Sequence, residues 1–367
     1  MIIQRKVVTY GIFIGLLLMG ACTGIAAFSK DEKGRTEVKE ELIAESFIQQ
    51  HLLKEDGRIQ TNITGQKDVY LSETVGLWME YLVMKNDFVQ FDQQVETLKK
   101  YFLTDDYLVA WELKGTNIAP ANAFIDDLRI IDALYIAGKQ WNHNAYTKLA
   151  DNMSKNLVRY QTEGKLMVDF IELESKNRGA DVTLSYIIPS GFDKMKQAKL
   201  LPSKTYEATR KVLLDAPHSA LGFFPKKYSV PTGNYSYDKE VNLIDQFYVG
   251  YHQAQWGGDV TSLLDFAKNA FAQGEGKLYG RYDSVTGKPT VAYEAVAVYA
   301  LAILMCLEIE DVDFAKKLYV QMKTLQQNDE GLPYLGGYID MGSKDTHTFD
   351  NLLALLAERR GLNEKVF

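Results

Sequence analysis

The chain has 367 residues, a formal net charge of −7 at pH 7 and only two cysteines, Cys22 and Cys306. An acidic chain without a run of Lys or Arg does not suit nucleic acid, so no nucleic-acid partner is expected. Two cysteines cannot build a disulfide framework, and the five histidines form no close ligand pair. We therefore expect no metal and no cofactor.

The first segment of the chain, residues 1–21, is typical of an export signal, because Arg5 and Lys6 precede an apolar run. The run ends in Met-Gly-Ala before Cys22, which resembles a lipobox whose cysteine is acylated; an uncleaved N-terminal membrane anchor is the alternative. Residues 22–38 are interpreted as a polar tether. The body, residues 39–367, is then expected at the extracytoplasmic face of the cell membrane.

Apolar residues recur at intervals of three and four along most of the body, which predicts amphipathic helices. The predicted helices cover residues 38–53, 72–85, 88–103, 124–138, 143–161, 191–199, 203–214, 240–254, 259–272, 291–308, 311–326 and 347–360. Twelve helices in pairs predict an all-α domain, an (α/α)6 barrel of six helical hairpins, and we expect a monomer. One strand-like segment, residues 166–171, predicts a small β-hairpin with part of residues 181–188.

Carboxylates lie at or near the start of two of these helical patterns, as Glu73 after Ser72 and as the pair Asp126 and Asp127. Trp111 lies between them in the chain. A glycosidase needs an acid to protonate the leaving oxygen, a base to activate water and an aromatic face for the sugar. As alternatives, Glu73 and Asp126 are helix-start residues favoured by the macrodipole, and Trp111 is a core residue.

Five short segments, in order, resemble glycoside hydrolase family 8, a family of bacterial endoglucanases and related chitosanases and xylanases. They are Ser72-Glu73 with Gly76, Asp126-Asp127-Leu128 with Trp141, Leu184-Ser185-Tyr186 with Pro189, Gly222-Phe223-Phe224-Pro225, and Tyr237-Asp238. The resemblance runs from about residue 70 to residue 300, which is most of the body.

This resemblance implies an (α/α)6 barrel and an inverting mechanism, with site residues carried over by position. Glu73 would be the general acid and Asp238 the base that activates water. Asp127 would bind sugar hydroxyls and help to hold the water, with Asp126 beside it. Tyr186 would lie next to the cleaved bond. Inverting enzymes hold their two carboxyl groups roughly 6.5–9.5 Å apart to leave room for that water.

The chain departs from the family pattern at three places, one of which is the acid segment, where Leu77-Trp78 replaces the usual Tyr-Gly. The family usually continues after the base with Ala, a variable residue and Arg-Val-Pro, whereas here Lys239 follows Asp238 and the Arg and Pro are absent. Asp245, on the following helix, is therefore a rival base. In addition, Ile125 replaces the first aspartate of the family's Asp-Ala-Asp segment. These changes indicate a divergent branch.

Taken together, these patterns predict a membrane-anchored inverting glycoside hydrolase whose partner is a polysaccharide, of the exopolysaccharide or biofilm type. The absent Arg-Val-Pro favours one alternative, a non-catalytic glycan-binding lipoprotein on the same fold. A polysaccharide lyase is the other alternative, and it would need a Tyr or His base near a uronic acid.

Overall fold

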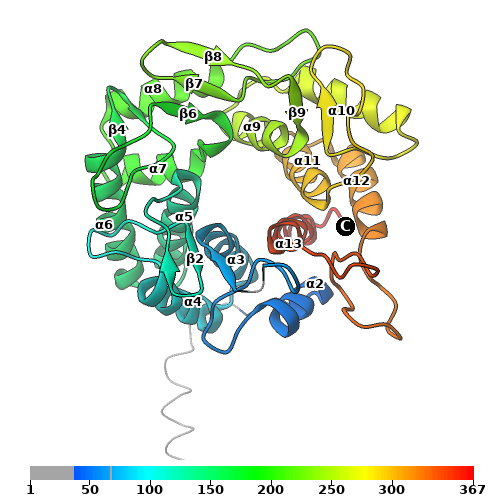
Figure 1. The fold of residues 1–367 in the computed structure, drawn as a ribbon, viewed down its shortest axis with the longest axis horizontal. Helices are drawn as coiled ribbons and strands as arrows, with labels where there is room; N and C mark the ends of the chain where they lie inside the picture. The colour runs from blue at the N-terminus through cyan, green and yellow to red at the C-terminus, as the bar shows by residue number, and fades with distance from the viewer. Residues whose placement is uncertain (1–36, 67) are drawn as a thin grey trace, which may run out of the picture. The chain divides into compact units, whose positions relative to one another are not determined.

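The computed structural model describes residues 37–66 and 68–367. Six helices of this part of the chain line the inside of a ring (Figure 1). They are α3 (Ser72–Lys85), α5 (Phe124–Gln140), α7 (Pro189–Gln197), α9 (Leu243–Gln255), α11 (Val296–Glu308) and α13 (Thr348–Asn363). Each contacts the next, and α13 returns to α3, so the ring is closed.

A second layer of helices surrounds this ring (Figure 1). Its members are α4 (Phe88–Tyr101), α6 (Asn144–Gln161), α8 (Ser203–Leu214), α10 (Thr261–Gln273), α12 (Val312–Thr324), and α2 (Ile43–Phe47), which continues into a π-helical turn, η1 (Ile48–Leu52). Both α2 and η1 pack on α13 and complete the sixth pair. The predicted (α/α)6 barrel is confirmed.

The two layers explain the two kinds of helical sequence. The inner helix α11 is buried from Ala297 to Leu307, because protein covers it on every side. The outer helix α6 buries one face only, with Tyr146, Leu149 and Met153 among its buried residues, and exposes the other. Residues Lys39–Phe367 form one compact unit around this core.

Short strands occupy the loops between the helices. They form the antiparallel sets β1 (Val69–Leu71) with β2 (Glu112–Lys114) and β3 (Asn117–Ile118), β6 (Asp181–Thr183) with β7 (Lys227–Ser229) and β8 (Asn234–Ser236), β9 (Glu240–Asn242) with β10 (Arg281–Asp283), and β4 (Thr162–Glu163) with β5 (Leu166–Met167). Two of them lead directly into inner helices: β1 precedes α3, and β9 precedes α9. The strands therefore fix where these helices begin.

Small β-hairpins are present as predicted, but the expected pairing of residues 166–171 with residues 181–188 is largely absent. Instead β5 pairs with β4, and β6 pairs with β7. The two segments are joined instead through Asp169, whose N–H donates to the Asp181 carbonyl (3.1 Å) and whose carboxylate accepts from the N–H (2.6 Å) and the hydroxyl (2.7 Å) of Thr183. The reason is local: Gly164, at φ +60°, lets the chain reverse directly after α6.

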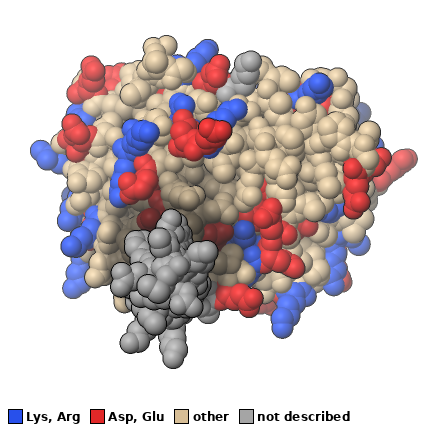
Figure 2. Space-filling model, turned by 90° about the horizontal axis from the view of Figure 1, so that it is seen from below, with Lys and Arg blue, Asp and Glu red and all other residues tan. Residues whose placement is uncertain are grey.

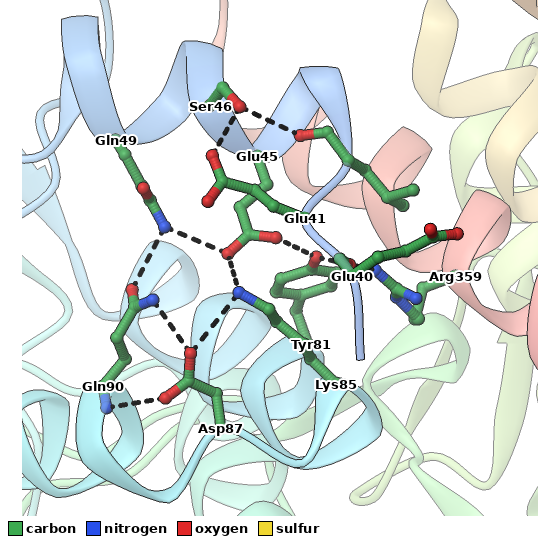
Figure 3. Close-up of polar contacts among 11 residues, drawn as sticks. Glu40, Glu41, Glu45, Ser46, Gln49, Tyr81, Lys85, Asp87, Gln90 and Arg359 are labelled. Atoms are coloured by element: carbon green, nitrogen blue, oxygen red, sulfur yellow. Dashed lines mark hydrogen bonds and ion pairs between the residues drawn. The ribbon is translucent and has the colours of Figure 1, made fainter. Parts of the chain in front are cut away.

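A buried polar cluster fastens the first helix to the ring (Figure 3). The carboxylate of Glu45, on α2, accepts hydrogen bonds from the Tyr81 hydroxyl (2.5 Å) and the Lys85 ammonium (2.6 Å), both on α3. From α13, Arg359 donates to the same Tyr81 hydroxyl (3.4 Å) and to the Glu40 carbonyl. The cluster thus joins the first and last helices of the described chain to α3.

The expected export signal, most of the tether and Cys22 lie outside the described residues. Within residues 37–66 and 68–367, no helix combines the length and the apolar character needed to cross a bilayer. Figure 2 shows one face of the molecule, on which acidic and basic side chains both lie among uncharged ones.

Candidate active site

The inner helices begin at one end of the barrel, because each outer helix returns antiparallel before the next inner helix starts. Contacts between helix starts bear this out. The Ser72 hydroxyl at the start of α3 donates to Asp126 in the first turn of α5 (2.6 Å). The Ala297 N–H of α11 donates to Asp350 in the first turn of α13 (2.9 Å). Carboxylates from several helices thus gather at this end.

Glu73 is held at this end by its neighbour Ser72, whose N–H donates to the carbonyl of Trp111 (3.0 Å). The same contact brings Trp111 beside the start of α3, and its side chain is 38% exposed. Glu73 is only partly exposed and keeps some accessible surface, although protein surrounds it. The predicted acid and the predicted sugar-stacking residue therefore lie close together.

The electrostatic surroundings of Glu73 keep it protonated. Burial raises the pKa of Glu73 to about 8, the negative charge of Asp126 adds to the rise, and Arg129 partly opposes it. Burial also raises the pKa of Asp126, to about 6, against the pull of Arg129 and of hydrogen bonds from Ser72 and the Glu73 backbone. Near pH 7 the pair is a neutral acid beside a carboxylate, which is the state that acid catalysis needs.

Arg129 lies beneath this pair, inside the barrel. Its guanidinium is 3.6 Å from the Asp126 carboxylate and 3.9 Å from that of Glu80, and it donates to the Tyr248 hydroxyl (3.2 Å). The helix α3 passes directly over it at Gly76, where a Cβ atom would be 3.1 Å from the Cδ atom of Arg129. The glycine of the Ser72-Glu73-x-x-Gly76 segment therefore makes room for this arginine.

The neighbouring aspartate, Asp127, lies inside the protein. Its side chain is fully buried, and its carboxylate accepts hydrogen bonds from the Val109 N–H (3.2 Å) and the Asn122 amide (2.8 Å). Burial raises its pKa well above the usual range. The sequence predicted that Asp127 binds sugar hydroxyls. In the structure its carboxylate ties the loop before α5 to that helix, and Asp126 is the aspartate that lies beside Glu73.

Tyr186 ends a short 3-10 helix, η2 (Leu184–Tyr186), which contacts both α5 and α9. Burial raises the pKa of Tyr186 to about 12, and the charges of Asp126, Asp169, Asp245 and Glu73 all add to the rise. A phenol with so high a pKa keeps its proton at neutral pH and can donate a hydrogen bond. Because η2 contacts both α5 and α9, Tyr186 lies between the helix that carries Asp126 and the helix that carries Asp245.

The two candidate bases share one lysine. The ammonium of Lys226 is 3.2 Å from the carboxylate of Asp238 and 3.4 Å from that of Asp245. Both aspartates line a cavity of about 290 Å³, together with Tyr237 and Ser284. Burial raises the pKa of Asp245 and Lys226 opposes the rise, whereas the Asp238 side chain is 41% exposed. The structure brings the two aspartates together and does not separate their roles.

A further carboxylate, Asp350, belongs to this end of the barrel and was missed in the sequence. Burial raises its pKa, and its charge helps to raise that of Glu73. The available signal was its position, since it is an acid in the first turn of an inner helix, as Glu73, Asp126 and Asp245 are. Among the described residues, no group of His, Cys, Asp and Glu is arranged to hold a metal ion.

Known proteins of similar structure include an alpha-amylase, an endoglucanase and a xylanase. No protein-family model matches the chain. A novel alpha-amylase from Clostridium perfringens is 26% identical with a TM-score of 0.81, covering 87% of this chain and 96% of that one. PssZ from Listeria monocytogenes is 26% identical with a TM-score of 0.73, covering 88% and 98%. A cold-adapted family 8 xylanase, 15% identical with a TM-score of 0.64 over 83% of each chain, shares the fold.

One curated protein matches along almost its whole length. "Putative lipoprotein YdaJ" of Bacillus subtilis (strain 168) is 37% identical over 357 residues, which are 96% of each chain. The (α/α)6 ring, the acid at the start of α3 and the structural similarity to family 8 enzymes agree with the motifs found in the sequence. The chain belongs to the family of this Bacillus protein, and it has the fold of the family 8 xylanase.

Proposed function

We propose that the chain is a glycoside hydrolase that cleaves a polysaccharide with inversion, and that Glu73 is its general acid. The observation that carries the proposal is the pair of carboxyls at the starts of α3 and α5. Glu73, with a pKa of about 8, holds a proton at neutral pH, while Asp126, with a pKa of about 6, is largely ionised. Trp111, exposed beside them, offers the sugar an apolar face.

In the proposed reaction Glu73 gives its proton to the glycosidic oxygen as the bond from that oxygen to the anomeric carbon breaks. An aspartate takes a proton from water, and the water oxygen attacks the anomeric carbon from the opposite face. Tyr186 donates a hydrogen bond to the sugar from its place between the two sides. Asp126 binds a sugar hydroxyl and keeps Glu73 protonated.

Asp238 remains the first candidate for the base and Asp245 the second. Two carboxylates share the single ammonium of Lys226, so the group of three carries one negative charge in excess. One aspartate can therefore neutralise the lysine while the other accepts a proton from water. Asp238 is the more exposed of the two and lies on a loop, which favours it as the group that reaches the water.

The name of the Bacillus relative supports a lipid-anchored location, as do residues 1–21 with Cys22. We therefore place the hydrolase outside the cytoplasm at the cell membrane, where the polymer within reach is an exopolysaccharide of the biofilm type. The second candidate function is a non-catalytic glycan-binding lipoprotein. Its support is that both candidate bases are paired with Lys226 and that the expected Arg-Val-Pro after Asp238 is absent.

The test measures reducing-end release from the extracellular polysaccharide of the producing cell, with the full chain and the variants Glu73→Gln, Asp238→Asn and Asp245→Asn. Glu55→Gln, at an exposed glutamate, is the matched control. We expect Glu73→Gln and one aspartate variant to lose at least about a hundredfold in rate, and the control to match the wild type. NMR of the first product formed would show the inverted anomer.

Retention of the configuration at the anomeric carbon would refute the inverting mechanism. Full activity in Glu73→Gln would remove Glu73 from the reaction. Tight binding of the polymer with no release by the wild type would favour the glycan-binding protein.

A further inference from the structure

A second cavity adjoins the one that holds Asp238 and Asp245. It measures about 430 Å³ and lies against α10 on the outside of the barrel. The two cavities share a wall, since Ser219 lines both. A second wall is also continuous, because Ser284 lines the first cavity and Thr286, two residues later, lines the second. A chain that leaves the first cavity along these walls enters the second; we call the second one the α10 groove.

The loop that carries Ser219 is fixed by close packing against α10. Gly222 has φ +87°, and a Cβ atom there would be 2.4 Å from the Ser262 carbonyl oxygen, so only glycine allows this approach. The next residue, Phe223, packs edge-on against Phe266 of α10, with ring centroids 4.4 Å apart. This wall of the groove is therefore formed before any ligand arrives.

The turn on the other wall is equally fixed and is joined to the candidate base. The carboxylate of Asp283 accepts hydrogen bonds from the N–H of Thr286 (2.7 Å) and from its hydroxyl (2.9 Å). The Ser284 N–H donates to the carbonyl of Lys239, the residue that follows Asp238 (2.9 Å). The groove thus has a constant position relative to the loop that carries Asp238.

The lining of the groove has the chemistry that binds sugar hydroxyls. Ser262, Asn269 and Gln273 project from α10 into it, and all three are exposed. Their side chains make no hydrogen bond within the described part of the chain, so their donors and acceptors are available. Phe266, half-buried, adds an apolar surface, and Asp265 is the one charged side chain among the lining residues. Such a lining suits a neutral, hydroxyl-rich ligand and repels an anionic one.

We propose that the α10 groove is a distal subsite for the polysaccharide, which binds neutral sugar units beyond the bond that is cut. This inference rests on the proposed function, because it takes the substrate to be a glycan. The subsite contributes affinity only to chains long enough to extend from the Asp238 cavity into the groove. The hydrolase therefore prefers long polymers to short oligosaccharides.

The test uses a double variant that carries both Asn269→Ala and Gln273→Ala. Its matched control carries both Gln93→Ala and Asn144→Ala. The control removes two exposed amides from other outer helices, α4 and α6. Both doubles are made in the full chain carrying Glu73→Gln, so that binding is measured without cleavage. Circular dichroism and the melting temperature confirm that each variant is folded.

Binding is measured by calorimetry with two probes: the purified extracellular polysaccharide of the producing cell, and fragments of two or three sugars made from it by partial acid hydrolysis. We expect the α10 double variant to bind the polymer about tenfold more weakly, as the loss of two hydrogen bonds implies, and to bind the fragments as before. The control should bind both probes like its parent. In the active chain, the same double variant should raise KM for the polymer and leave kcat unchanged.

Unchanged polymer binding by the α10 double variant, an equal loss for polymer and fragments, or no polymer binding by the parent chain would each overturn the inference. Failure of the proposed function looks different. In that case the wild type releases no reducing ends, while the polymer still binds and its binding still depends on Asn269 and Gln273.

Discussion

The raised pKa of Glu73 has a consequence for stability that can be measured before the substrate is known. The ordinary pKa of a glutamic acid, 4.5, applies to the unfolded chain, whereas burial and the charge of Asp126 raise it to about 8 in the fold. Between these two values the unfolded chain gives up the proton and the folded chain keeps it. The free energy of unfolding therefore falls as the pH rises from 4.5 to 8. The variant Glu73→Gln has no such proton and should escape this loss.

The size of the effect follows from the two pKa values. A rise from 4.5 to about 8 corresponds to about 5 kcal/mol at most, at about 1.4 kcal/mol per pH unit. Glu73 keeps some accessible surface, and solvent screens its charge, so we expect about 2–3 kcal/mol. The sign is fixed by the direction of the shift: relative to the wild type, Glu73→Gln becomes more stable as the pH rises.

The assay is urea unfolding of the wild type and of Glu73→Gln at pH 5 and pH 8, followed by tryptophan fluorescence. At each pH, the free energy of unfolding of the wild type is subtracted from that of Glu73→Gln. The assay then compares this difference at pH 5 with the difference at pH 8. Glu55→Gln, at an exposed position, should show almost no change. A constant difference for Glu73→Gln across this range would refute the raised pKa and, with it, the assignment of Glu73 as a proton donor at neutral pH.

Three further changes have expected outcomes. Asp126→Asn removes a negative charge next to Glu73, so the alkaline limb of kcat/KM against pH should move down by about one pH unit; an unmoved limb would contradict the coupling. Gly76→Ala places a methyl group against Arg129 and should cost about 1–3 kcal/mol, measured by urea unfolding, unless the arginine can shift. Glu45→Gln breaks the buried cluster of Figure 3 and should cost about 3–5 kcal/mol in the same measurement, whereas a loss below about 1 kcal/mol would show that the cluster contributes little.

Periodicity predicted the helices well because each layer of the barrel imposes its own pattern. The outer helix predicted over residues 143–161 is observed as Asn144–Gln161, with one face buried. Helix starts were less accurate where a strand or a proline intervenes. The helix predicted from residue 240 begins at Leu243, because β9 takes the three residues before it. The helix predicted from residue 191 begins at Pro189, whose ring suits the first turn.

The site was harder to predict because its contacts join distant segments. The hydrogen bonds between Ser72 and Trp111 span 39 residues, and no periodic pattern carries that information. The choice between Asp126 and Asp127 depends on helix rotation, since neighbouring residues of a helix point about 100° apart. Motif alignment favours Asp127, whereas the start of α5 directs Asp126 to Ser72 and turns Asp127 inward. Asp350 was missed because an acid in the first turn of a helix is also a common helix-start residue, so its position alone did not mark it as part of the site.

The closure of the ring by α13 determines when this protein can fold. The last helix packs on both α11 and α3, and α2 with η1 packs on it in turn. During synthesis the first helices emerge long before α13, so an apolar gap between α3 and α11 stays open until nearly the whole chain is available. Contacts so distant in sequence form slowly and leave apolar surface exposed meanwhile. A truncation after residue 347 would thus act as a folding defect, although it leaves Glu73 and Asp238 in the chain.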